Sequence, residues 1–195
     1  MAYFGSRTAK DDSDDDDDDE NIERVKNTIY YYGDVNRKNV LKFHKLLREA
    51  TDDIRKQMIE TGCEGKIFVN ICSDGGSVFD GLAAMDTIAS NPVPVTTIME
   101  GAVCSAATFL ALGGKHVTIR PSGHVLIHQI RSTFWGKYEE FKDEKETLDK
   151  LMEKLRNLYS TKTNLPRKVL SEMFQRDIYI NAEECIKWGV AHSIV

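Results

Sequence analysis

The sequence is poor in the features that mark disulfide-rich, metal-binding and membrane proteins. Its 195 residues include only four cysteines and four prolines, and no run of about 18 apolar residues occurs. The cysteines show neither a CxxC motif nor a metal-ligand spacing, which predicts reduced thiols in a cytoplasmic protein (Cys63, Cys72, Cys104 and Cys185). Without a long apolar run we predict no membrane span, and Met1–Lys10 lacks the apolar core of a signal peptide.

An excess of charge of one sign is also missing, except in one short segment. The net charge of -5 comes from Asp11–Glu20, where nine of ten residues are acidic. Residues 1–20 hold these nine of the 31 acidic residues and two of the 26 basic ones, so the remainder carries 22 acidic and 24 basic side chains. Such a block of like charges predicts a disordered acidic arm over residues 1–27. We favour a solubilising role, with docking to a basic partner as the alternative, and expect no nucleic-acid or membrane partner.

Residues 28–195 are predicted to form a single α/β domain. Short apolar runs alternate there with segments in which apolar residues recur every three or four positions, the patterns of strands and amphipathic helices. Alternation of strand and helix implies right-handed crossovers and a mainly parallel sheet. The predicted strands are residues 28–33, 66–72, 93–99, 116–119 and 124–127, and the predicted helices are residues 40–58, 79–88, a short segment after Ser105, and 181–188.

A much longer helical pattern follows these elements. From Tyr138 to about Tyr159 one apolar stripe runs through a segment rich in lysine and glutamate. This helix is long for a domain with short strands. It either protrudes as an arm, over residues 137–165, that meets another subunit, or packs along its own domain.

Ser105 is the candidate nucleophile. It follows an apolar run and opens a helix of small residues, in Gly101-Ala-Val-Cys-Ser105-Ala-Ala. A serine at a strand-to-helix turn exposes its hydroxyl beside backbone N–H groups, which is what acyl transfer requires. Taken alone, such a serine is more often a helix N-cap, and the G-x-S-x-G signature of α/β-hydrolases is absent.

Three further candidates are weak one by one. His128 ends an apolar run and could be a core histidine, Asp177 could form an ordinary ion pair with Arg176, and Gly75-Gly76 could be a simple turn. Each is predicted to lie at the end of a strand or in a loop that follows one. Because the carboxyl ends of parallel strands share one edge of the sheet, we expect these residues to gather there.

Four segments then occur in a specific order. They are Ser73-Asp-Gly-Gly-Ser77, Gly101–Ala107, Leu126-Ile-His128-Gln129, and Arg176-Asp177 followed by Asn181-Ala-Glu-Glu and Trp188-Gly-Val. In this order they resemble the ClpP-type serine peptidases, the proteolytic subunits of ATP-dependent Clp proteases, whose motifs read S-P-G-G-S, A-S-M-G, M-I-H-Q-P and R-D with S-A-E-E-A and Y-G-L-I-D. The resemblance runs from about Thr28 to Val195 and implies the crotonase-like ClpP fold in a divergent member.

The resemblance implies a serine endopeptidase with a catalytic triad. Ser105 would be the nucleophile, His128 the general base and Asp177 the acid that orients it, while Gly75, Gly76 and Ala106 would bind the oxyanion and the substrate backbone. The implied assembly is a homo-oligomeric ring, a heptamer or a double-ring tetradecamer, that acts on polypeptide substrates. No cofactor is expected, because ATP would be used by a separate AAA+ unfoldase ATPase.

Several positions depart from the family pattern. Asp74 stands in place of a proline, and Ile130-Arg131 in place of Pro-Leu. Asn70 replaces a tyrosine that helps the family bind ATPase loops, and Gln175 replaces an aspartate that pairs across rings. Two alternatives therefore stay open: a viral peptidase of this fold that processes capsid or scaffold proteins, and a non-peptidase, either a crotonase-fold acyl-CoA enzyme or an inactive ring subunit.

Overall fold

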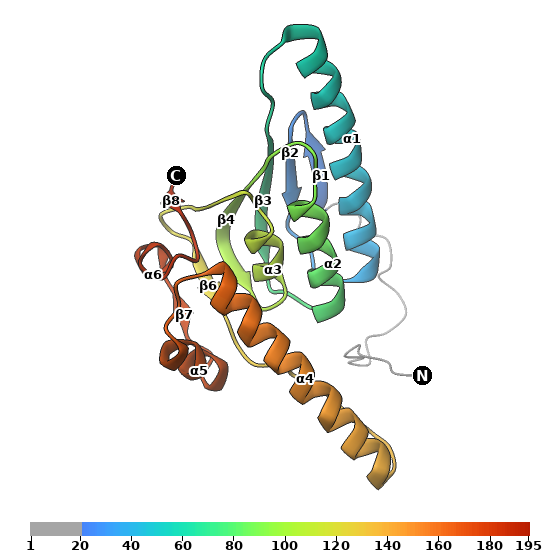
Figure 1. Cartoon of the computed structure of the whole chain (residues 1–195), viewed down its shortest axis with the longest axis vertical. Coiled ribbons are helices and arrows are strands. Elements are labelled where there is room, and N and C mark those ends of the chain that lie inside the picture. The colour runs from blue at the N-terminus through green and yellow to red at the C-terminus, as the bar shows by residue number, and fades with distance from the viewer. Residues whose placement is uncertain (1–20) are drawn as a thin grey trace.

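An eight-stranded, mostly parallel sheet organises residues 21–195, the part of the chain that the computed structural model describes (Figure 1). Its main path is β1-β2-β3-β4-β5-β8, and every neighbouring pair in this path is parallel except β1–β2. The strands are β1 (Ile22–Val25), β2 (Thr28–Tyr31), β3 (Ile67–Ser73), β4 (Val95–Cys104), β5 (His116–Ile119) and β8 (Ser193–Ile194). The predicted α/β class with a mainly parallel sheet is confirmed.

Strand β4 has two partners along one of its edges. Its first part pairs with β5 over Thr96–Met99, and its last part pairs with β6 (His124–Leu126) over Ala102–Cys104. Gly101, with φ +56, stands between the two parts, in a conformation that favours glycine. The prediction ended this strand at residue 99, so it was wrong by five residues. Because the strand extends to Cys104, Ser105 follows it directly.

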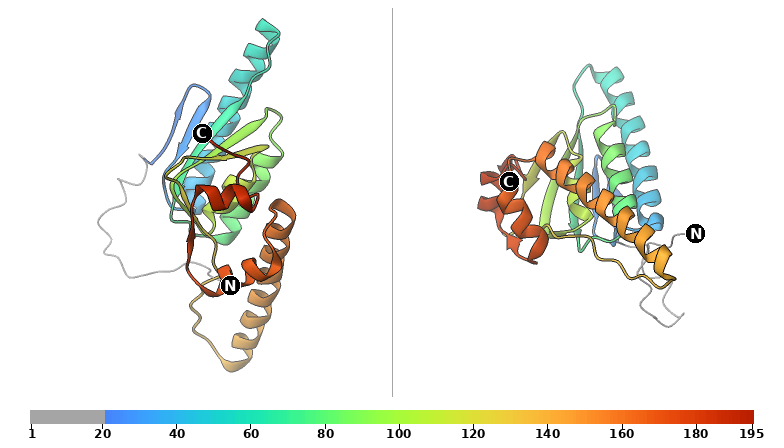
Figure 2. Two further views of the ribbon diagram at one scale, coloured as in Figure 1. Left: turned by 90° about the vertical axis from the view of Figure 1, so that its left-hand side faces the viewer. Right: turned by 60° about the horizontal axis from the view of Figure 1, so that its bottom comes forward.

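The predicted helices form and cover the sheet (Figures 1 and 2). They are α1 (Arg37–Thr61), α2 (Val78–Ala89), α3 (Ala107–Leu112) and α6 (Ala182–Lys187). Phe43 and Leu47 of α1 are fully buried in the core. Gly81 permits close packing of α2 on the start of α3, because a Cβ there would lie 2.9 Å from the Ala106 carbonyl oxygen. The short helix α3 is thereby fixed directly after Ser105.

Four elements were not predicted, one of them the two-residue strand β8 near the end of the chain. Strand β1 lies within the predicted disordered arm of residues 1–27, so that boundary was wrong, while residues 1–20 lie outside the described part of the chain. Helix α5 (Arg167–Gln175) buries Leu170, Met173 and Phe174. Strand β7 (Tyr179–Ile180) pairs antiparallel with β6.

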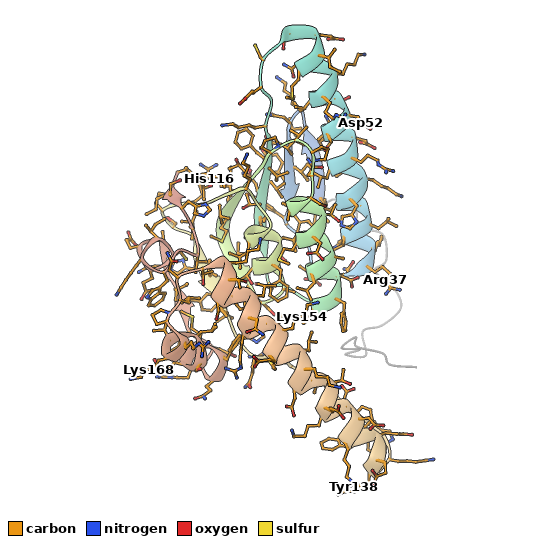
Figure 3. The ribbon with its side chains drawn as sticks, viewed as in Figure 1. Arg37, Asp52, His116, Tyr138, Lys154 and Lys168 are labelled. Atoms are coloured by element: carbon orange, nitrogen blue, oxygen red, sulfur yellow. The ribbon has the colours of Figure 1, made fainter. Side chains whose placement is uncertain are left out.

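Helix α4 (Tyr138–Lys162) protrudes from the domain (Figures 1 and 2). Its buried residues all lie in its second half, at Leu151, Leu155 and Tyr159. Tyr138 lies at the tip of the projecting end (Figure 3). Of the two interpretations of this helix, the protruding arm fits its first half. No helix within residues 21–195 combines the length and hydropathy needed to cross a membrane.

Candidate active site

The candidate residues meet at one edge of the sheet. The parallel strands β3, β4 and β6 run toward this edge, and Gly75-Gly76, Ser105 and His128 follow their ends. Asp177 instead precedes β7, which corrects the expectation that every candidate follows a strand. Because β7 is antiparallel to β6, the start of β7 still lies at the end of β6.

Ser105 holds a strained backbone conformation. Its φ is +54, the left-handed region that residues with a Cβ seldom adopt and that costs about 1–3 kcal/mol. The Ser105 N–H donates to the Leu126 carbonyl at 2.8 Å, and its own carbonyl accepts from the Thr108 N–H at 3.0 Å. The N-cap of α3 is Ala106, so Ser105 is not the helix cap that its sequence context allowed. Strain of this kind is concentrated at functional sites.

Gly75 packs directly against the serine turn. Its φ is +96, and a Cβ added there would lie 2.8 Å from Ser105 Cβ and 2.6 Å from the Cys104 carbonyl oxygen. The same Cβ would lie 3.1 Å from the backbone nitrogen of Ala106. Only glycine therefore allows the loop after β3 and the turn after β4 to come this close.

Two backbone N–H groups at this junction remain open. Val35 forms backbone hydrogen bonds with the two neighbours of Gly76. Its N–H donates to the Gly75 carbonyl, and its carbonyl accepts from the Ser77 N–H, both at 2.7 Å. The Gly76 N–H takes no part in this pairing, and neither it nor the Ala106 N–H donates to any residue in the described part of the chain. Open N–H groups beside a serine are the elements of an oxyanion hole.

The structure does not join the three predicted triad members. His128 Nδ1 lies 2.6 Å from the carbonyl oxygen of Gln129. The Asp177 carboxylate forms an ion pair with the Arg131 guanidinium. Among the described residues, no hydrogen bond links His128 to Ser105 or to Asp177.

The strand register nevertheless aligns the base with the acid. In the antiparallel pair β6–β7, Val125 lies opposite Ile180 and Leu126 lies opposite Tyr179. Continuing this register by two residues places His128 opposite Asp177. Opposite residues of an antiparallel ladder have Cα atoms about 4.5–5.5 Å apart. If the pairing of β6 with β7 continued for two more residue pairs, the His128 imidazole and the Asp177 carboxylate would therefore lie side by side.

Sequence reasoning missed two neighbours of Ser105. Tyr179 Oη lies 3.8 Å from Cys104 Sγ, and burial raises the pKa of the Cys104 thiol. Thr108 Oγ1 donates to the Ser105 carbonyl at 2.6 Å. The short strand that carries Tyr179 shows no periodicity, while Thr108 follows Ser105 by three residues and could have been expected at the turn. In residues 21–195 no group of three or more metal-ligating side chains occurs.

Comparisons with known proteins find a matching family and a similar fold. The family model described as Clp protease matches residues 26–195. Proteins named ATP-dependent Clp protease proteolytic subunit from Oryza sativa subsp. indica, Triticum aestivum and Sorghum bicolor are each 32% identical over 149 residues, covering 73% of this chain and 68% of the relative. A mutant ClpP1 from Listeria monocytogenes has a similar fold, with a TM-score of 0.74 at 21% identity over 87% of this chain and 91% of that one.

Proposed function

The chain belongs to the Clp protease family, and from this membership we propose that it is a proteolytic subunit that hydrolyses peptide bonds with Ser105 as the nucleophile. The observation that carries the proposal is the strained Ser105 turn packed on Gly75, with the open N–H groups of Gly76 and Ala106 beside it. The family membership favours peptide hydrolysis over the acyl-CoA alternative.

The proposed reaction has two steps. His128 takes the Ser105 proton while Oγ attacks the peptide carbonyl, and then returns the proton to the leaving amine. Water hydrolyses the acyl-enzyme in the second step. The Gly76 and Ala106 N–H groups would bind the oxyanion, and one such donor typically lowers the barrier by about 2.7–4 kcal/mol. Asp177 would fix the His128 tautomer once the β6–β7 ladder extends to them. The reaction requires no cofactor in this proposal, and ATP would be used by a separate ATPase.

A fluorophosphonate probe tests the nucleophile. The full-length protein should be labelled at Ser105 and should cleave peptides, while Ser105→Ala should lose both activities. Ser132→Ala, an exposed serine in the loop after His128, is the matched control and should keep both. Labelling that persists in Ser105→Ala would refute the assignment, and an assembled wild type that neither labels nor cleaves would support the inactive-subunit alternative.

We also propose that the protruding arm contacts other copies in a ring-shaped assembly, a heptamer or a double ring. The arm ends in an aromatic tip, here defined as Phe134, Trp135, Tyr138 and Phe141, which are 37%, 99%, 73% and 57% exposed. Exposed apolar clusters of this kind mark protein interfaces. The first half of α4 has no buried residue, so its own domain covers little of its surface.

Native mass spectrometry tests the assembly. The double variant Trp135→Ser/Phe141→Ser should shift the protein to smaller oligomers. Ile59→Ser, which changes an 85% exposed side chain in the last turn of α1, should leave the assembly mass unchanged. A wild type that is monomeric at micromolar concentration, or a double variant with the wild-type mass, would contradict this role of the arm.

A further inference from the structure

The first half of α1 carries charge of only one sign. Between residues 37 and 48 it has five cationic side chains and no acidic one, at Arg37, Lys38, Lys42, Lys45 and Arg48, which together we name the basic surface. Arg37, Lys45 and Arg48 are exposed, and none of these three forms an ion pair with a described residue. Cations near a helix start oppose the helix dipole, so the stability of α1 itself does not explain them.

A groove runs beside this surface. It has a volume of about 680 Å³ and lies between α1 and the segment that ends α2. Lys45 and Arg48 line it together with the exposed Leu41, and Ser90 and Pro92 form the opposite wall. With Arg55 the lining holds three cations against one carboxylate, Asp52, so the groove offers net positive charge and an apolar side chain to an extended, acidic chain.

The residue that follows the acidic segment in the sequence, Asn21, lies near the start of α1. Asn21, the first described residue, accepts a hydrogen bond from the Tyr32 N–H at 2.9 Å. A Cβ on Gly33 would lie 3.5 Å from Asn21 Cβ and 2.9 Å from Nδ2 of Asn39, so Asn21 lies beside the first turn of α1. Arg37 marks this end of the helix and Asp52 lies farther along it (Figure 3).

From these observations we propose that Asp11–Glu20 binds the basic surface of α1 in the same chain. Nine carboxylates in ten residues match the five cations in sign. Ten extended residues reach about 33 Å, and the helix from Arg37 to Arg48 spans roughly 17 Å, so the segment is long enough to follow it. The bound segment neutralises this surface and excludes other acidic partners from it. This inference does not depend on the peptidase activity.

Zero-length crosslinking with a carbodiimide tests the contact, because it joins a lysine amine to a carboxylate only when the two touch. In the full-length protein at low salt, Lys45 should crosslink to the acidic segment within one chain, which keeps its single-chain mass under denaturing conditions. Lys154 and Lys168, on α4 and α5, should not (Figure 3). In about 1 M salt, where the screening length is about 3 Å, the yield should fall about tenfold.

Charge reversal supplies the matched control. Lys45→Glu/Arg48→Glu should reduce crosslinking at Lys42 about tenfold, whereas Arg167→Glu/Lys168→Glu makes the same charge change on α5 and should leave the yield unchanged. Crosslinks found mainly at two-chain mass would assign the segment to a neighbouring copy and overturn the proposal. Equal crosslinking of Lys45 and Lys168 would also overturn it.

A second experiment changes only the acidic segment and leaves the sequence of residues 21–195 unaltered. Changing the nine acids of residues 11–20 to their amides should increase the rate of Lys45 acylation by an amine-reactive reagent about fivefold or more, with no change at Lys168. Equal Lys45 rates in the two proteins would show that the segment does not cover the basic surface.

Discussion

The hydroxyl of Tyr159, on the arm helix α4, lies 2.6 Å from Thr108 Oγ1 at the start of α3. Thr108 uses its single hydroxyl proton to bind the Ser105 carbonyl, so Tyr159 is the donor in the first bond. Complete burial raises the pKa of the Tyr159 phenol, which keeps it protonated for this role. The arm is therefore connected to the nucleophile turn by two consecutive hydrogen bonds.

Tyr159→Phe should weaken this connection with little change in volume. The loss of one buried hydrogen bond should lower the free energy of unfolding by about 1 kcal/mol, measured by urea denaturation. Fluorophosphonate labelling of Ser105 should also slow. Tyr138→Phe, at the exposed tip of the same helix, should stay within about 0.5 kcal/mol of wild type. Equal stability of the two variants would show that the Tyr159 bond is not stabilising.

Gly75→Ala should be far more damaging than Gly62→Ala. Both glycines have positive φ, +96 and +70, so both substitutions carry a backbone cost of about 1–2 kcal/mol. Only at Gly75 would the new Cβ collide with backbone atoms, at 2.6 Å from the Cys104 carbonyl oxygen, while Gly62 has open space. We expect a loss of about 3 kcal/mol or more for Gly75→Ala, with loss of Ser105 labelling. Similar losses from both variants would contradict the close approach.

The strong periodicities in the sequence were sufficient to predict most of this fold. Helix α1 and strand β3 repeat apolar residues at intervals of a helix and of a buried strand, and their burial follows those repeats. Strand β1 was missed because it has four residues and adjoins the acidic segment. Strand β7 has two residues and exists only through pairing with β6, which no local pattern reveals.

The candidate site was also predictable only in part. Ser105 and Gly75 were identified from motif and position, and the structure places them in contact. The separation of His128 from Asp177 could not be predicted, because it depends on the path of the loop after β6 and on which cation that loop brings to the carboxylate. Such long-range pairing is set by tertiary structure rather than by local sequence.

Glu100 should contribute stability that disappears in acid. Its carboxylate accepts hydrogen bonds from Tyr32 at 2.5 Å, and from Asn70 and Arg120 at 2.8 Å. Burial alone would raise the pKa of Glu100, but these bonds outweigh it and hold the pKa below its usual value. The contribution is therefore present above the unfolded pKa of about 4.3 and is lost as the pH falls through the lower folded value.

Glu100→Gln should reveal this dependence in urea denaturation at several pH values. At pH 7 the variant should unfold at lower urea concentration than wild type, and the difference should shrink as the pH falls below about 4. Glu60→Gln, at an exposed position on α1, should show little difference at any pH. A difference between Glu100→Gln and wild type that stays constant with pH would exclude the carboxylate as its source.

Arg131 should restrain the proposed triad by holding Asp177 away from His128. Arg131→Gln should increase the rate of Ser105 labelling about two- to fivefold, because an exposed ion pair contributes up to about 1 kcal/mol. Added salt should speed labelling of wild type, since it screens the pair, but should hardly affect Arg131→Gln. Arg167→Gln removes the same charge from the start of α5 and should behave as wild type, and Arg131→Lys should retain part of the restraint. Slower labelling of Arg131→Gln would mean that Arg131 instead holds Asp177 in its productive position.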